Sequence, residues 1–195
     1  MSNFEIFEEE VLDRVREDIK RLTDIYQDHQ FFWSNAGGWA PAEAEKILSK
    51  SRLDWLHALS ESLYTWTDVY RTTTDNEGKL ILAWANLGAL LEGGIKLFLS
   101  VHIISYKNSS NCYKDSSGII IEPDGLNLEK LKVFLQKENI FDKKWYKFIT
   151  KVQERRNAIH AYKDRDIGNW AEFYESIEQL YQLTKEIKER LPYPN

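Results

Sequence analysis

The chain has 195 residues, a net charge of −5 at pH 7 and a sequence pI near 5.5, and 43% of its residues are hydrophobic. This length suits a single domain, residues 1–195, and the acidic balance excludes a surface that is basic overall and drawn to nucleic acid or anionic membrane. A single cysteine, Cys112, excludes an internal disulfide and a cysteine-based zinc site. The first ten residues are acidic and lack the features of a signal peptide, so we expect a cytoplasmic protein.

Apolar residues recur at steps of three and four along most of the chain, which is the spacing of amphipathic helices. This periodicity predicts helices over 3–30, 42–70, 80–106, 126–139, 142–160 and 169–191. Glycine, proline, serine and charged residues interrupt the pattern and predict loops at 31–41, 72–78, 107–125 and 163–168. Only the short run 119–121 favours a strand. We therefore expect an all-α fold, an antiparallel bundle of five or six helices.

The most apolar predicted helix, 80–106, is long enough to cross a membrane. Glu92, Lys96 and His102 argue against a membrane span, since charged groups are costly inside lipid. We expect a central helix of the bundle and no membrane partner. Glu92 and Lys96 stand four residues apart and can pair. The pair lies at the helix rim or supports a functional site, and the sequence leaves both open.

Several common kinds of site are missing from the sequence. The four histidines lie on different predicted helices, and there is no His-Glu-x-x-His motif, paired cysteine or di-iron carboxylate–histidine spacing. No glycine-rich phosphate loop, nucleophile elbow or serine triad signature occurs either. We therefore expect neither a metal nor a cofactor.

The segment 154–162, Glu-Arg-Arg-Asn-Ala-Ile-His-Ala-Tyr, carries the candidate chemistry. Arg156 falls in the sector of its helix that holds the apolar residues, and His160 lies close beside that sector. An unpaired buried charge is expensive, so this face should reach a cleft, a partner or a set of hydrogen-bonding groups. The apolar residues of this face are Trp145, Phe148, Ile149, Val152 and Ile159.

An arginine and a neutral histidine suit work on a phosphodiester. The guanidinium fork neutralises charge that builds on the non-bridging oxygens. An imidazole, with a reference pKa of about 6.5, can take or give a proton near neutral pH. The histidine would act on the ribose 2′-hydroxyl or on the leaving oxygen, so this mechanism needs RNA rather than DNA and requires no metal.

The motif resembles a known family. Arg155, four residues, His160, one residue and Tyr162 match the R-x4-6-H signature of HEPN domains, in the R-x4-H-x-Y form of HEPN toxins that pair with minimal nucleotidyltransferase antitoxins. Asn157 lies within the motif, where a polar residue is frequent. The spacing of Glu92 and Lys96 resembles a Glu-x-x-x-Lys pattern found on an earlier HEPN helix.

This resemblance implies a metal-independent endoribonuclease, usually a toxin or an antiphage effector. It implies a homodimer in which both motifs line one cleft. Arg155 and His160 would carry catalysis, with Asn157 assisting. Glu92 and Lys96 would support the site, and Tyr162 would be a candidate for modification by an antitoxin, although a packing role is the simpler interpretation of that tyrosine.

The identity of the catalytic arginine stays open. Arg155 and His160 are five residues apart, about 140° around a regular helix, whereas Arg156 and His160 are better stacked. The helix could end here, Arg155 and His160 could meet across a dimer, or Arg156 could do the work of the family arginine. Arg52 and His57 share the spacing of Arg155 and His160, but His57 points away from the apolar line of its helix.

Two other functions compete with the endoribonuclease. A HEPN-like module can dimerise or bind RNA or protein without chemistry, and the acidic pI favours both this function and the next one. A helical subunit of a larger complex could use the arginines in a salt-bridged interface, with His160 as a helix-end histidine bonded to a carboxylate such as Asp164. The joint occurrence of Arg155, Asn157, His160 and Tyr162 favours the endoribonuclease.

Overall fold

The computed structural model describes residues 9–67, 76–160 and 162–193, and all regular structure in these ranges is helical. The all-α prediction is therefore confirmed for this part of the chain. The α-helices, in chain order, are α1 (Glu9–Trp33), α2 (Ala42–Leu48), α3 (Leu53–Glu61), α4 (Asn76–Val101), α5 (Ile103–Asn108), α6 (Leu128–Lys137), α7 (Lys143–Arg156) and α8 (Trp170–Glu189). Three short 3₁₀ turns accompany them: η1 (Ser62–Thr67), η2 (Pro123–Gly125) and η3 (Asn157–His160).

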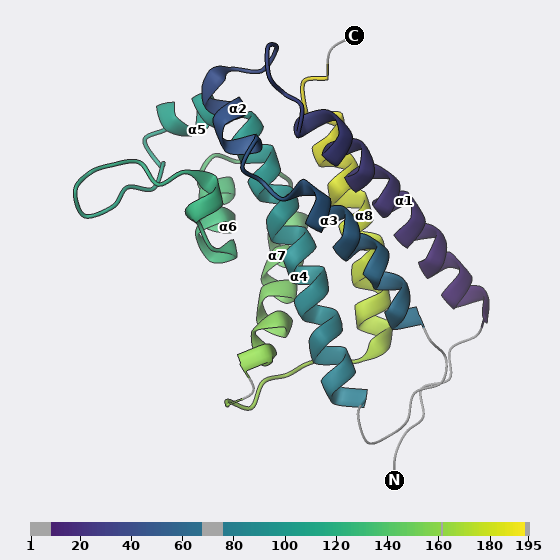
Figure 1. Cartoon of the computed structure of the whole chain (residues 1–195). Helices are drawn as coiled ribbons and strands as arrows, with labels where there is room; N and C mark the ends of the chain where they lie inside the picture. Colours follow the sequence, from purple (N-terminus) through teal and green to yellow (C-terminus); the bar gives the residue numbers. More distant parts are fainter. Residues whose placement is uncertain (1–8, 68–75, 161, 194–195) are drawn as a thin grey trace.

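The central helix of this bundle is α4. It packs against α3, α7 and α8, while α1 packs against α3 and α8 (Figure 1). Fifteen of its 26 residues are buried, which accounts for the most apolar stretch of the sequence. By length and composition, α4 is also the one helix in the described ranges that could cross a membrane. In Figure 1, α3 and α7 run opposite to α1, α4 and α8, so the bundle is antiparallel only in part.

The single helix predicted over 42–70 is divided into α2, α3 and η1, and residues 68–75 lie outside the described part of the chain. Between α2 and α3, the hydroxyl of Ser51 donates to the carbonyl of Ile47 at 2.9 Å, and Arg52 leaves the helical region with φ −92° and ψ 64°. Serine side chains that bond to the backbone compete with helix formation. The apolar spacing carried no sign of this competition.

The helix predicted over 80–106 is also divided, because His102 leaves helical geometry (φ −93°, ψ 31°) between α4 and α5. The first helix continues beyond its predicted end to Trp33, and its predicted start lies among residues 1–8, which are not described. The helices α6, α7 and α8 lie within their predicted ranges. The described residues therefore form eight α-helices instead of five or six. The run 119–121 contributes only an isolated bridge to Lys114.

Candidate functional site

The candidate motif lies where α7 gives way to the 3₁₀ turn η3. Arg155 and Arg156 are the last residues of α7, Asn157 is its C-cap, and His160 ends η3. Of the alternatives left open by the sequence, the structure therefore has a helix that ends at the motif. A 3₁₀ turn winds more tightly than an α-helix, so side chains beyond Arg156 leave the line set by α7. Ile159, predicted to continue the apolar line, is 43% exposed for this reason.

Arg155 binds α8 and the connection that precedes it. Its Nε and Nη2 donate to the Glu172 carboxylate at 3.0–3.2 Å, and its Nη1 donates to the Asp166 carbonyl at 2.6 Å. The same Nη1 lies 2.6 Å from the Asp166 carboxylate. Burial alone would lower the pKa of Arg155, but the hydrogen bonds that it donates to Asp166 and Glu172 outweigh burial and raise that pKa. All three guanidinium nitrogens are thus occupied.

Gly168 makes room for this cluster. Its φ of +66° is a conformation that glycine adopts without steric cost. A Cβ at this position would collide with the carboxylate of Glu172 and would lie 3.1 Å from Nε of Arg155. The connection between α7 and α8 therefore depends on glycine here for both backbone and side-chain reasons.

Arg156 points instead toward α4. Its Nη1 donates to the Glu92 carboxylate at 2.8 Å, and Lys96 pairs with the other Glu92 oxygen at 2.8 Å. The predicted Glu92–Lys96 pair is therefore confirmed, and Glu92 also forms an ion pair with Arg156 of the motif. Burial would raise the pKa of Glu92, but Lys96 and Arg156 outweigh burial and lower it. The stem of Arg156 crosses α4 at Gly88, where a Cβ would lie 2.5 Å from its Cδ.

His160 is exposed, and no hydrogen bond joins its imidazole to another residue in the described ranges. The predicted alternative, a helix-end histidine bonded to Asp164, is thus not what the structure has. Tyr162 is 98% exposed, so its interpretation as a packing residue is wrong. Asn157 is half-buried, and its side chain makes no hydrogen bond to the described residues.

The two arginines therefore diverge although they are adjacent in the sequence. The structure brings Arg156, Glu92 and Lys96 together and places Arg155 in a separate cluster on α8. On Arg156, Nε and Nη2 have no hydrogen-bond partner among the described residues, because only Nη1 is engaged. Arg156 thus keeps donors that an anion could use, whereas Arg155 does not.

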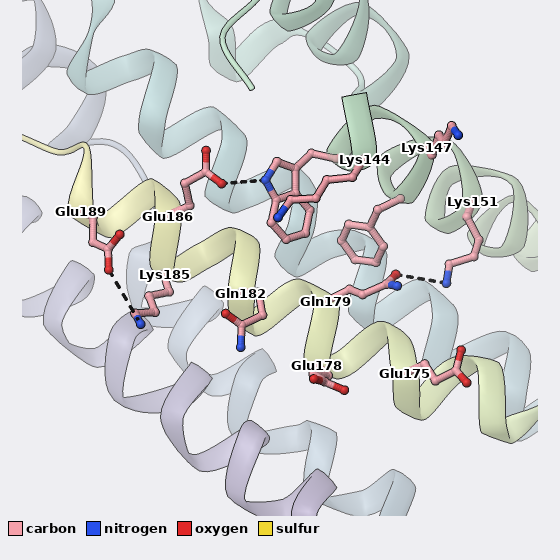
Figure 2. Close-up of a pocket in the computed structure, with 12 residues that line it drawn as sticks. Lys144, Lys147, Lys151, Glu175, Glu178, Gln179, Gln182, Lys185, Glu186 and Glu189 are labelled. Carbon is pink, nitrogen blue, oxygen red and sulfur yellow. Dashed lines mark hydrogen bonds and ion pairs between the residues drawn. The ribbon is translucent and has the colours of Figure 1, made fainter. Parts of the chain in front are cut away.

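A groove of about 1070 Å³ lies along α7, away from the motif, between α7 and α8 (Figure 2). The buried aromatic side chains of Trp145 and Phe148 line it, and the indole of Trp145 donates to Glu186 at 2.6 Å. Lys151 donates to Gln179 at 3.2 Å, and burial lowers its pKa. The walls hold as many lysines as glutamates: Lys144, Lys147, Lys151, Lys185, Glu175, Glu178, Glu186 and Glu189.

Nothing in the sequence marks the charged residues of this groove as functional. A helix with charges on its solvent face is usually just solvated, so the lysines of α7 gave no separate signal. The signal that could have been used is the local charge: α7 holds six basic residues and one acidic residue, in a chain that is acidic overall.

Within the described residues, no group of three His, Cys, Asp or Glu side chains is placed to hold a metal ion. A comparison with protein-family models, curated proteins and solved structures finds no match to this chain. The likeness to HEPN domains therefore rests on the motif residues alone, and what they can do must be inferred from the contacts of Arg155, Arg156 and His160.

Proposed function

We propose that this protein is a metal-independent endoribonuclease in which His160 transfers protons and Arg156 binds the scissile phosphate. One observation carries the proposal. Among the described residues, the exposed His160 has no hydrogen-bond partner, and it lies in η3, four residues after Arg156, which retains unengaged donors at the end of α7. A proton-transfer group must be accessible to substrate, and a phosphate ligand must have unoccupied N–H groups.

In this mechanism His160 accepts the proton of a ribose 2′-hydroxyl. The 2′-oxygen attacks phosphorus, the bond to the 5′-oxygen breaks, and that oxygen leaves with a proton. The products carry a 2′,3′-cyclic phosphate and a 5′-hydroxyl. Arg156 stabilises the charge on the non-bridging oxygens, while Glu92 and Lys96 position Arg156, and Asn157 assists between the two reacting groups.

Arg155 takes a different role in the proposal from the one that the family resemblance implies. Its contacts with Glu172 and Asp166 fix the chain that follows η3, so it acts as a positioning residue. A homodimer that places two η3 turns in one cleft would supply a second His160, so that one histidine accepts a proton while the other donates one. Tyr162, being fully accessible, suits modification by a nucleotidyltransferase-type antitoxin in a cytoplasmic toxin or antiphage setting.

A second candidate function is a HEPN-like module that binds RNA or protein without chemistry. The observation in its favour is that both arginines already have carboxylate partners, Glu172 and Glu92. In this case the arginines hold the fold together, and His160 is one exposed residue of a binding surface.

Cleavage of mixed RNA by the purified protein in excess EDTA tests the proposal. We expect 2′,3′-cyclic phosphate ends, with activity lost in His160→Ala and Arg156→Ala. Arg52→Ala and His57→Ala are the matched controls, because this pair has the spacing of Arg155 and His160 and should have no effect. Absence of cleavage by a folded, dimeric wild type, with or without Mg²⁺, would favour the binding module. Cleavage that survives His160→Ala would indicate a contaminating nuclease.

A further inference from the structure

The charge of this acidic chain is divided unevenly between its parts. Residues 128–156, which contain α6 and α7, hold nine Lys and Arg against four Asp and Glu, a net charge of +5. The remaining residues hold 17 basic and 27 acidic side chains, a net charge of −10. A basic region on an acidic protein is the local electrostatic footprint that a polyanion needs.

Within this region, a second groove of about 620 Å³ lies between the end of α6 and α7. We call it the α6–α7 groove. Its charged lining is Lys143, Lys147 and Lys151, with Glu154 as the one carboxylate. Lys143 and Lys147 are exposed, and neither has an ion-pair partner among the described residues. These cations are therefore available to a ligand, unlike Arg155 at the end of the helix, whose three guanidinium nitrogens are all engaged.

The α6–α7 groove also offers neutral hydrogen-bonding groups and a fixed shape. The exposed amides of Gln136 and Asn139 line it and are not bonded to other described side chains. The hydroxyl of Tyr146 donates to the Leu135 carbonyl at 2.8 Å and accepts from the Phe141 amide at 3.0 Å, so it fixes α6 against α7. Lysines with amide side chains are typical contacts to phosphate and sugar.

The larger groove between α7 and α8 does not suit a polyanion. There a phosphate backbone would meet as many glutamates as lysines. Figure 2 shows Lys147 pointing away from the α8 wall that carries these glutamates. Charge thus favours the smaller groove over the larger one.

We propose that the α6–α7 groove binds the phosphate backbone of RNA and leads it along α7 to Arg156 and His160. This inference rests on the proposed function, because the destination of the strand is the candidate catalytic turn. Lys143, Lys147 and Lys151 follow one another at four-residue steps, about 6 Å apart along the axis, in the direction of Arg155 and Arg156. The groove is therefore a substrate-binding surface distinct from the reacting groups.

Binding of a fluorescein-labelled single-stranded RNA of about 15 nucleotides tests this proposal. The protein is the full chain carrying His160→Ala, so that binding is measured without cleavage. Adding Lys143→Glu and Lys147→Glu should weaken binding about tenfold or more at low salt. The slope of the logarithm of the binding constant against the logarithm of salt concentration should become less steep by about 0.7 for each lost phosphate contact. Lys20→Glu with Lys50→Glu, two exposed lysines elsewhere, makes the same change in net charge and should have little effect.

The outcomes separate this groove from the proposed chemistry. Equal losses in the groove and control variants, or no loss in either, would overturn the groove. If wild type cleaves RNA and a protein with His160 intact that carries Lys143→Glu and Lys147→Glu cleaves it equally well, the proposed role of the groove is wrong and the proposed nuclease activity is supported. If RNA binding depends on the groove lysines but wild type never cleaves RNA, RNA binding by the α6–α7 groove is supported and the proposed nuclease activity is wrong. Preference for a poly-glutamate peptide over RNA would also overturn the proposal.

Discussion

Arg155 and Arg156 are neighbours in the sequence, yet their surroundings differ in kind. Arg155 lies among Glu172, Asp166 and the Gly168 turn, and each of its guanidinium nitrogens has an acceptor. Arg156 reaches across α4 to Glu92 with one nitrogen, and its other two nitrogens have no partner in the part of the chain that the structure describes. The contacts of Arg155 engage all of its donor nitrogens in holding α7, α8 and their connection together. The contact of Arg156 with Glu92 fixes its guanidinium but, among the described residues, leaves two nitrogens available to a ligand. In the proposed nuclease, this contrast, rather than the motif spacing, assigns the positioning role to Arg155 and the catalytic role to Arg156.

The largest expected effect concerns Arg156, the arginine that keeps unengaged donors. Arg156→Ala should reduce RNA cleavage by roughly 10²–10³-fold, because it removes a preorganised donor for the phosphate oxygens. Its cost in stability should be about 1 kcal/mol or less, since Glu92 keeps Lys96 as a partner. Cleavage rates and urea unfolding of the same preparation measure both. A folded Arg155→Ala protein with an equal loss of cleavage would contradict the division of roles.

The next largest expected effect concerns Gly168, which packs against Arg155 and Glu172. Gly168→Ala should lower the free energy of unfolding by about 2–3 kcal/mol, because a positive φ and a collision with Glu172 act together. Gly118→Ala is the matched control: Gly118 has φ +81°, but its Cβ would meet nothing within 4 Å. Strain alone should cost about 1 kcal/mol there. Equal losses in urea unfolding would show that crowding at Arg155 and Glu172 is unimportant.

Removal of the Arg155 side chain should have a smaller effect. Arg155→Ala should destabilise the fold by about 1–2 kcal/mol, because Glu172 loses a partner in a partly buried pair. Cleavage per folded molecule should change much less than in Arg156→Ala. Thermal or urea unfolding with an active-site titration separates the two quantities. Unchanged stability together with lost cleavage would move the catalytic role back to Arg155.

The smallest expected effect is a dependence on pH at Glu92. Its pKa is lowered in the folded state, so the unfolded chain takes up a proton first as the pH falls. The stability it contributes is present above its ordinary pKa of about 4.3 and is lost as the pH falls through the lower folded value. Wild type should therefore lose stability relative to Glu92→Gln over this acid range, by about 1 kcal/mol or less. A difference that does not change with pH in urea unfolding would contradict the ion-pair account.

Much of the helical layout could be predicted from the sequence, because amphipathic spacing is a local property. The buried residues Leu12, Val15, Ile19 and Leu22 follow it along α1. The breaks near Ser51 and His102 could not, since they depend on a side-chain bond and on a backbone angle that no apolar period records. Existence and type of helices were therefore predicted better than their number.

The candidate site was predictable in composition but not in arrangement. The motif spacing, together with the position of Arg156 and His160 on or beside the apolar face, indicated Arg155, Arg156 and His160, and pairing at four residues predicted Glu92 with Lys96. The partners that distinguish the arginines come from distant segments: Glu172 lies 17 residues away and Glu92 lies 64 residues away. Because such contacts arise only when helices pack, the sequence could indicate the candidate residues but not which arginine keeps unengaged donors.

The missing side chain at Gly88 offers a position at which the proposed nuclease could be inactivated without replacing Arg156 or His160. The stem of Arg156 fills the space above this glycine, so even one methyl group there would push the arginine off α4. Gly88→Ala would then leave Arg156 and His160 chemically intact while separating one from its support. In the proposed nuclease, such a variant would lose cleavage while the lysines of the α6–α7 groove still bind RNA, so that the bound RNA could be recovered and sequenced.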